Sequence, residues 1–393
     1  MKARATQNRA LLAGVCCLII AMGIGRFAYT PLLPAMQRAV GFGNELAGLV
    51  ASANYLGYFL GALATTVLPA SLDRRGLLRI SLLASIVTTA AMAWTESAPA
   101  WIALRLVAGL ASAGAFVLAG TLVMQSLQSV GQETRMGVHF CGVGLGIAFS
   151  GLLLAQAGDY LGWRGGWTVL AVFSVALLPL CWTIPRPKSL ATSHATKIDA
   201  AVAVKPLAFP MQLLVIAYFL EGLGYIVSGT FLVAIIKGTP GLEAFAEYAW
   251  VAVGLTAAPS AMLWSAVLKK TGPLKALIAA HLIQAAGIVL PVFSDSLAAA
   301  LVAAITFGGT FVGITVLAIN LAARVAPQSS GNVIGQLTAA FGLGQILGPL
   351  AAGLIAGGGR GFDMPLLVAG GTVALGALLL LAGAISKKMI APY

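Results

Sequence analysis

Long apolar runs alternate with short polar breaks along almost the whole chain. Each run is about 20 residues or longer, which is enough for a helix to cross the hydrocarbon core of a bilayer. Twelve such runs lie at residues 11–34, 46–70, 76–95, 100–127, 135–157, 165–184, 211–236, 246–268, 274–294, 297–323, 332–357 and 363–385. Because backbone groups in lipid must be hydrogen-bonded within the chain, the pattern predicts an all-α membrane protein with twelve transmembrane helices.

The longest polar stretch divides these runs into six and six. It covers residues 185–210, contains prolines and basic residues, and predicts a cytoplasmic linker between bundles at 1–184 and 211–393. The two halves also resemble each other. Met22 to Arg26 (MGIGR) matches Glu221 to Tyr225 (EGLGY), and further glycines and basic loops match in the same order. This repeat favours two parallel bundles with a solute site between them near mid-membrane.

Composition and charge indicate where the chain lies and how it is oriented in the membrane. The chain is 60% hydrophobic and 9% charged, so its main partner is the lipid bilayer. Its net charge of +12 is unevenly placed. If the N-terminus is cytoplasmic, only Arg38, Arg164, Lys237 and Arg360 fall on the outer side, while most other basic residues lie inside. This predicts cytoplasmic termini and excludes nucleic acid as the reason for the charge.

Several motifs resemble those of the major facilitator superfamily of transporters. Asp73 to Arg79 (DRRGLLR) is similar to the family's cytoplasmic loop motif, and Arg105 with Gly109 has the spacing of its fourth-helix motif. Gly344 to Pro349 resembles its Gly-x-x-x-Gly-Pro motif. Gly23 to Met36, together with Glu221 to Tyr225, is similar to the YbfB/YjiJ-type branch. The resemblance implies the major facilitator fold, with two pseudo-symmetric six-helix bundles.

Two ionisable residues deep inside the runs are the first candidates for a site. Such groups cost about 3 kcal/mol each on membrane-insertion scales, which favours a functional role. Arg26 shares a helical face with Tyr29, and Glu221 shares one with Tyr225. We expect both faces to line a central cavity, where Arg26 attracts an anionic or dipolar solute and Glu221 binds and releases a proton. The alternative is a permanent Arg26–Glu221 ion pair that only holds the halves together.

Other polar residues are candidates for supporting roles. Arg105 lies near the outer end of the fourth run, where it either lines the site or extends its charge to the membrane interface. Further side chains either hydrogen-bond the solute or pack helices together: Asn54, Tyr55, Tyr58, Gln336 and Gln345. His139 and His281 lie near the cytoplasmic ends of their runs and are expected to be interfacial polar groups.

The loop after the second run is a candidate gate. Asp73, Arg74, Gly76 and Arg79 are predicted to form a cytoplasmic contact that breaks and re-forms as the halves move. The alternative is a basic loop that only sets the orientation in the membrane.

Together these features favour a monomeric secondary transporter in the bacterial inner membrane that moves a small organic solute by proton-coupled alternating access. A membrane enzyme would need clustered His, Asp, Glu or Cys, and the sequence suggests no such cluster, so no catalytic residue, metal or cofactor is expected. An ATP-driven pump would need a Gly-rich phosphate loop that the chain lacks. A receptor or channel stays as the alternative, although no sensor domain or lined pore is visible.

Overall fold

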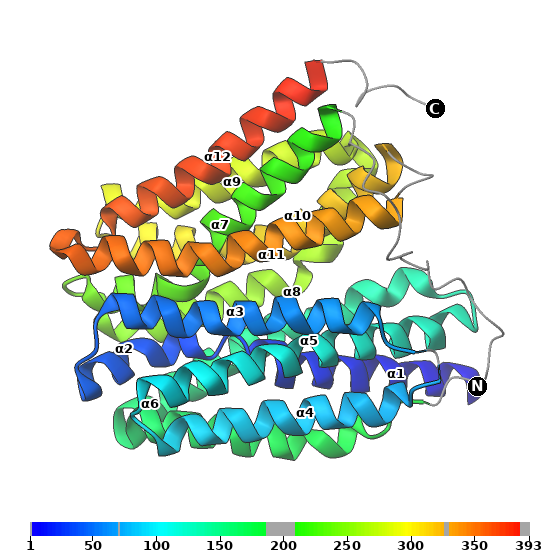
Figure 1. Ribbon diagram of the computed structural model, residues 1–393, viewed down its shortest axis with the longest axis horizontal. Helices are drawn as coiled ribbons and strands as arrows, with labels where there is room; N and C mark the ends of the chain where they lie inside the picture. The colour runs from blue at the N-terminus through cyan, green and yellow to red at the C-terminus, as the bar shows by residue number, and fades with distance from the viewer. Residues whose placement is uncertain (1, 70, 186–208, 326–329, 386–393) are drawn as a thin grey trace.

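The computed structural model describes residues 2–69, 71–185, 209–325 and 330–385, which are almost entirely helical (Figure 1). The α-helices are α1 (Lys2–Leu18), α2 (Tyr29–Val40), α3 (Asn44–Thr66), α4 (Arg74–Ala91), α5 (Ala98–Gln128), α6 (Met136–Cys181), α7 (Phe209–Gly238), α8 (Ala246–Thr271), α9 (Pro273–Phe293), α10 (Leu297–Val325), α11 (Ser330–Ile355) and α12 (Asp363–Ile385).

Within this described part, twelve helical spans are long and apolar enough to cross a membrane, which confirms the number predicted from the sequence. The first span, Thr6–Val40, joins α1 and α2 through a broken segment. Helix α6 contains the sixth span, Tyr160–Cys181, and all but the first three residues of the fifth, Glu133–Gln156. The chain reverses between them near Gly162, whose φ of 62° is a conformation that glycine adopts without steric cost.

The spans run alternately in opposite directions, with α1 to α6 in the lower part of Figure 1 and α7 to α12 in the upper part. Helices α3 and α11 pack together across the middle, as do α6 and α8. The division at residues 185–210 stays a prediction, since 186–208 of that stretch lie outside the described residues. The cytoplasmic placement of the termini likewise stays a prediction.

A glycine contact recurs at corresponding places in the two halves. Gly109 of α5 packs on the backbone carbonyl of Asn54 in α3, and Gly308 of α10 packs on the backbone carbonyl of Val253 in α8. Neither position has room for a β-carbon, so any larger residue would force the helices apart. The two bundles are therefore assembled around the same close helix crossing.

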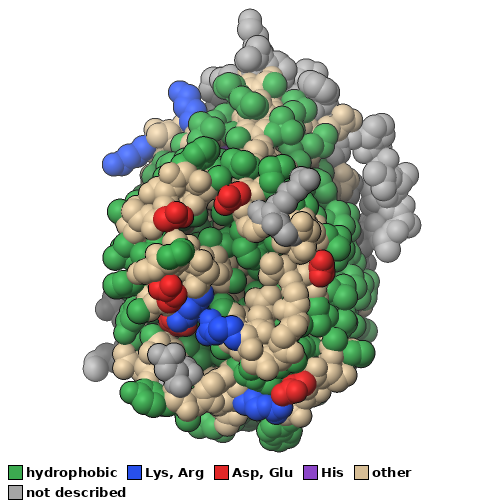
Figure 2. Space-filling model, turned by 90° about the vertical axis from the view of Figure 1, so that its left-hand side faces the viewer, with side chains coloured by type: hydrophobic (Ala, Val, Ile, Leu, Met, Phe, Trp, Pro, Cys, Tyr) green, Lys and Arg blue, Asp and Glu red, His purple; other side chains and the backbone are tan. Residues whose placement is uncertain are grey.

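The outer surface is apolar around the sides of the bundle. Figure 2 looks at the end opposite the start of α1, where charged side chains lie on the end face and hydrophobic side chains surround them. Large apolar residues such as Val87, Leu263 and Leu378 are more than half exposed. This distribution suits lipid around the sides and water at the ends.

Candidate functional site

The first span is interrupted where the candidate Arg26 lies. A π-helical segment, Ile19–Ile24, precedes four turn residues, and regular helix resumes at Tyr29. Pro31 explains the break, because it has no N–H and its ring clashes with the carbonyl of the residue four positions earlier, Phe27. The Phe27 carbonyl instead accepts a hydrogen bond from the backbone N–H of Thr30 at 3.2 Å. The break leaves nearby carbonyls without helical partners.

Arg105 of α5 supplies donors to that break. Its Nη1 donates to the carbonyl oxygen of Gly25 at 2.8 Å, and its Nη2 donates to the carbonyl oxygen of Arg26 at 2.7 Å. The side chain is 3% exposed, so it points into the protein and does not reach the membrane interface. Asn54 in turn donates to the carbonyl of Arg105 at 3.0 Å. Arg105 is therefore a positioning residue that holds the backbone of the broken span.

Arg26 itself lies among aromatic rings. Its Cζ lies 3.9 Å from the ring centroid of Tyr58, 4.8 Å from that of Tyr55 and 5.5 Å from that of Phe27. The side chain is 3% exposed, and its Nε and Nη1 have no hydrogen-bond partner among the described residues. No described carboxylate forms an ion pair with Arg26, and cation–π contacts offset only part of the cost of burying a guanidinium.

An aromatic wall from the second half faces this residue. We use that name for Tyr218 and Tyr225 of α7, Phe307 and Phe311 of α10, and Phe341 of α11. Neighbouring rings in the wall have centroids 4.5 to 6.1 Å apart and planes within 22° of each other. Phe27 meets the wall edge-on, 6.1 Å from Phe311.

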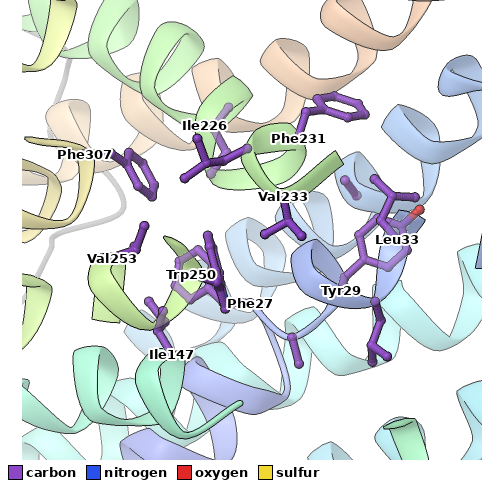
Figure 3. Packing of buried hydrophobic residues seen from close by; sticks show 14 of the residues in the cluster. Phe27, Tyr29, Leu33, Ile147, Ile226, Phe231, Val233, Trp250, Val253 and Phe307 are labelled. Carbon is purple, nitrogen blue, oxygen red and sulfur yellow. The ribbon is translucent and has the colours of Figure 1, made fainter. Parts of the chain in front are cut away.

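Both halves contribute to the buried cluster around this place. Figure 3 shows Phe27, Tyr29 and Leu33 of the first span in the same cluster as Ile226 of α7 and Phe307 of α10. Thr30 also donates a hydrogen bond to the carbonyl oxygen of Gly229 in α7 at 2.5 Å. The broken span therefore forms part of the interface between the halves.

Glu221 lies on α7, one helical turn from Tyr225 of the aromatic wall, and its partners lie on helix α9. The side-chain amide of Gln284, oriented to satisfy its neighbours, donates to both carboxylate oxygens of Glu221 at 2.6 and 2.8 Å. His281 Nε2 is 3.9 Å from the carboxylate, while its Nδ1 is 2.9 Å from the carbonyl oxygen of Leu277. Glu221 and His281 are each about 1% exposed.

Two of the relationships considered from the sequence are wrong. In the described part of the chain Arg26 and Glu221 form no ion pair, because the Glu221 carboxylate turns toward α9. That Tyr29 shares a face with Arg26 stays a prediction, and the Tyr29 ring lies 5.3 Å from the Cζ of Arg105. His281 is not interfacial, because α9 buries it against α7.

The remaining candidates lie in three different surroundings. Gln345 donates a short hydrogen bond to the hydroxyl of Tyr225, at the edge of the aromatic wall. Gln336 is only half-buried, nearer the start of α11. His139 is fully buried beside Gly14, which does not fit the interfacial role expected of it.

The loop motif caps α4. Asp73 accepts a hydrogen bond from the backbone N–H of Arg75 at 3.1 Å and so caps the helix that begins at Arg74. The Cζ of Arg79 lies 5.3 Å from the ring of Trp182, and Arg75 donates to the Trp182 carbonyl at 2.6 Å. Gly76 lies against the Asp73 side chain. These contacts all lie within the first half, so the gating role stays a prediction.

Sequence reasoning missed two groups of residues. It did not select Gln284, although His281 and Gln284 are polar residues three positions apart on an apolar helix, which is a signal that they share a face. It also missed Phe307, Phe311 and Phe341. Phenylalanines in membrane spans are too common for the sequence alone to distinguish a binding surface from packing.

Comparison with known proteins places the chain among transporters. Residues 18–381 match the family model described as uncharacterised MFS-type transporter YbfB. A chloramphenicol resistance protein of Streptomyces lividans is 30% identical over 254 residues, which cover 62% of this chain and 61% of that protein. A gallate transporter of Pseudomonas putida is 26% identical over 176 residues, which cover 44% of this chain and 39% of that protein. The match thus spans less than two thirds of either relative.

Solved structures share the architecture. The crystal structure of the nucleoside transporter NupG superposes with a TM-score of 0.76, covers 96% of this chain and 99% of that chain, and is 15% identical in sequence. At this level of identity the likeness describes the fold alone.

Proposed function

Because this chain belongs to the YbfB-type family of major facilitator superfamily transporters, whose model matches residues 18–381, we propose that it moves a small organic solute across a membrane by alternating access. The family is one of transporters rather than enzymes, in agreement with the prediction from the sequence. The observation that carries the proposal is Arg26, a buried cation at a helix break between the two halves that has no counter-ion among the described residues.

The solute in this proposal is an organic anion that binds Arg26. A discontinuous span near mid-membrane is a common place for the solute in transporters, because it exposes backbone and side-chain polar groups to the interior. Gallate, which gives its name to the Pseudomonas putida relative, is a small organic anion. Proteoliposomes containing the purified protein test the function: uptake of labelled organic anions above that of empty vesicles supports transport, and its absence for every solute contradicts it.

We further propose that transport is coupled to protons through Glu221. Its carboxylate is held by the Gln284 amide and lies 3.9 Å from the Nε2 of His281, which has no hydrogen-bond partner among the described residues, so two groups that can each bind a proton lie side by side. Tyr218 and Tyr225 of the same helix are the other ionisable side chains near it. Glu221 and Tyr225 are four residues apart on α7, so a solute against Tyr225 changes the surroundings of the carboxylate.

Glu221→Gln separates coupling from solute movement. Glutamine keeps the size of the side chain but cannot carry the proton, so we expect gradient-driven accumulation to fall to the level at equilibrium, while exchange of solute between both sides continues. The measurement is proteoliposome uptake with and without an imposed pH gradient. Glu243→Gln, at an exposed position, is the matched control. Full gradient-driven accumulation by Glu221→Gln would contradict the coupling role.

Alternating access also requires the α3–α11 contact to open. Gly48 of α3 packs on the carbonyl of Pro349 in α11, and Ser52 donates to the Ile346 carbonyl at 2.7 Å. A side chain at position 48 would hold the helices apart, so we expect Gly48→Leu to reduce the transport rate by at least tenfold. The rate at which a thiol reagent labels a cysteine placed near the start of α3 should increase, because the variant holds this end of the α3–α11 contact open.

Gly371→Leu is the matched control, because Gly371 on α12 faces open space and a side chain there meets nothing within 4 Å. Wild-type rates in both variants would mean that the α3–α11 contact does not need to close during the cycle.

A further inference from the structure

The buried charges of the described residues are not all satisfied. Arg105 has two backbone carbonyls as partners, and Glu221 has the amide of Gln284. Only Arg26 combines near-complete burial with two guanidinium nitrogens that lack hydrogen-bond partners. A buried cation without an anionic partner is stabilised when an anion binds it, so Arg26 can bind one negative charge carried by the solute.

From this and the aromatic wall we propose that the solute is a single-ring aromatic monocarboxylate, whose carboxylate binds Arg26 and whose ring lies against Tyr225 and Phe311. The inference rests on the proposed transport function and narrows its solute to one chemical class.

The charged end of the solute follows from the shape of Arg26. A guanidinium is planar and its N–H groups match the two oxygens of a carboxylate in parallel hydrogen bonds. One side of the charge is taken by the rings of Tyr58 and Tyr55, with the nearer centroid at 3.9 Å. An anion therefore has to meet Arg26 at the unpartnered N–H groups that these rings leave free.

The aromatic end follows from the wall. The Tyr225 ring lies 6.1 Å from Phe311 with planes 12° apart, and 5.3 Å from Phe341 with planes 14° apart. Because these rings are nearly parallel, a flat ligand ring can extend the stack, and stacked or edge-on ring pairs add attraction beyond the area they bury. The Phe27 ring connects the two ends, because it lies next to Arg26 and 6.1 Å from Phe311.

The number of charges on the solute is limited to one. Among the described residues the second half adds no Lys or Arg to the wall, which is apolar apart from the Tyr hydroxyls and Gln345, and Glu221 lies one helical turn from Tyr225. A second carboxylate would face these rings and a buried carboxyl group, which is unfavourable in a medium of low dielectric.

Three probes of similar size test the class. Benzoate has the ring and the charge, cyclohexanecarboxylate has the charge without a flat ring, and benzamide has the ring without the charge. By calorimetry on purified protein we expect benzoate to bind about threefold to tenfold more tightly than cyclohexanecarboxylate, and benzamide to bind at least 30-fold more weakly than benzoate.

Variants assign these preferences to residues. Phe311→Leu should remove the preference for benzoate over cyclohexanecarboxylate while both still bind, and Tyr225→Leu should do the same if Phe311→Leu does not fold. Phe293→Leu is the control, because Phe293 is 74% exposed on α9. Melting temperatures confirm that each variant is folded.

The outcomes separate this inference from the proposed function. Equal affinity for benzoate and cyclohexanecarboxylate, or a preference that survives both wall variants, overturns the aromatic class. Flux of a non-aromatic solute without any binding of benzoate overturns this inference and leaves the transport function intact. Binding of benzoate without flux of any solute would instead contradict the transport function.

Discussion

Arg26→Gln is expected to abolish transport while leaving the protein at least as stable as the wild type. Glutamine removes a buried positive charge that has no counter-ion, so folding no longer has to bury that charge. Solute binding, in contrast, loses its charged partner. Removing one member of a buried charge pair typically costs about 2–5 kcal/mol, which corresponds to a loss of affinity of roughly 30-fold or more.

Thermal unfolding in detergent and proteoliposome flux measure the two effects separately. Arg26→Lys keeps the charge but not the planar fork, so we expect intermediate binding. Arg164→Gln is the matched control, because Arg164 is a half-exposed residue paired with Glu96 at 2.8 Å. A large fall in melting temperature for Arg26→Gln with normal flux would reverse our interpretation and make Arg26 a structural residue.

Arg105→Gln is expected to have the opposite effect on stability. Its guanidinium donates to the carbonyls of Gly25 and Arg26, and these donors replace helical N–H groups that the break removes. Unsatisfied carbonyls in a membrane interior are costly, and two charge-assisted hydrogen bonds are lost, so we expect stability to fall by about 3–5 kcal/mol. Transport should also fall, because the backbone that carries Arg26 loses its support.

The contrast between the two arginines is the test. The free energy of unfolding measured with denaturant should be well below the wild-type value for Arg105→Gln. For Arg26→Gln it should equal or exceed the wild-type value. Arg164→Gln should change stability by less than about 1 kcal/mol, as is usual for exposed ion pairs. If Arg105→Gln proved as stable as the wild type, the helix break would not depend on Arg105.

The sequence was sufficient for the spans, and it singled out Arg26 and Glu221, which the structure buries. A membrane helix must be apolar over a fixed length, so its span is visible in one stretch of sequence, and an ionisable residue within it is conspicuous. The loop of Asp73 and the recurring glycines could be recognised in the same way, because each is a local pattern.

The partners of these residues were not predictable from the same patterns. The helical spacing of Arg26 and Tyr29 holds only for a regular helix, and Pro31 breaks that helix just before Tyr29. Glu221 pairs with His281 and Gln284 because α9 packs on α7, and which helices become neighbours depends on the packing of the whole bundle. The position of His281 along its span predicts that it lies near water, but the packing of α9 buries its side chain.

The helix break also has a consequence for how the protein is made. Spans enter the membrane in chain order, so the ring partners of Arg26 at Tyr55 and Tyr58 arrive with the very next span. The carbonyls that Arg105 binds must wait until α5 has been inserted. The first span therefore enters the bilayer already broken at Pro31, and the donors for its Gly25 and Arg26 carbonyls arrive only with the fourth span.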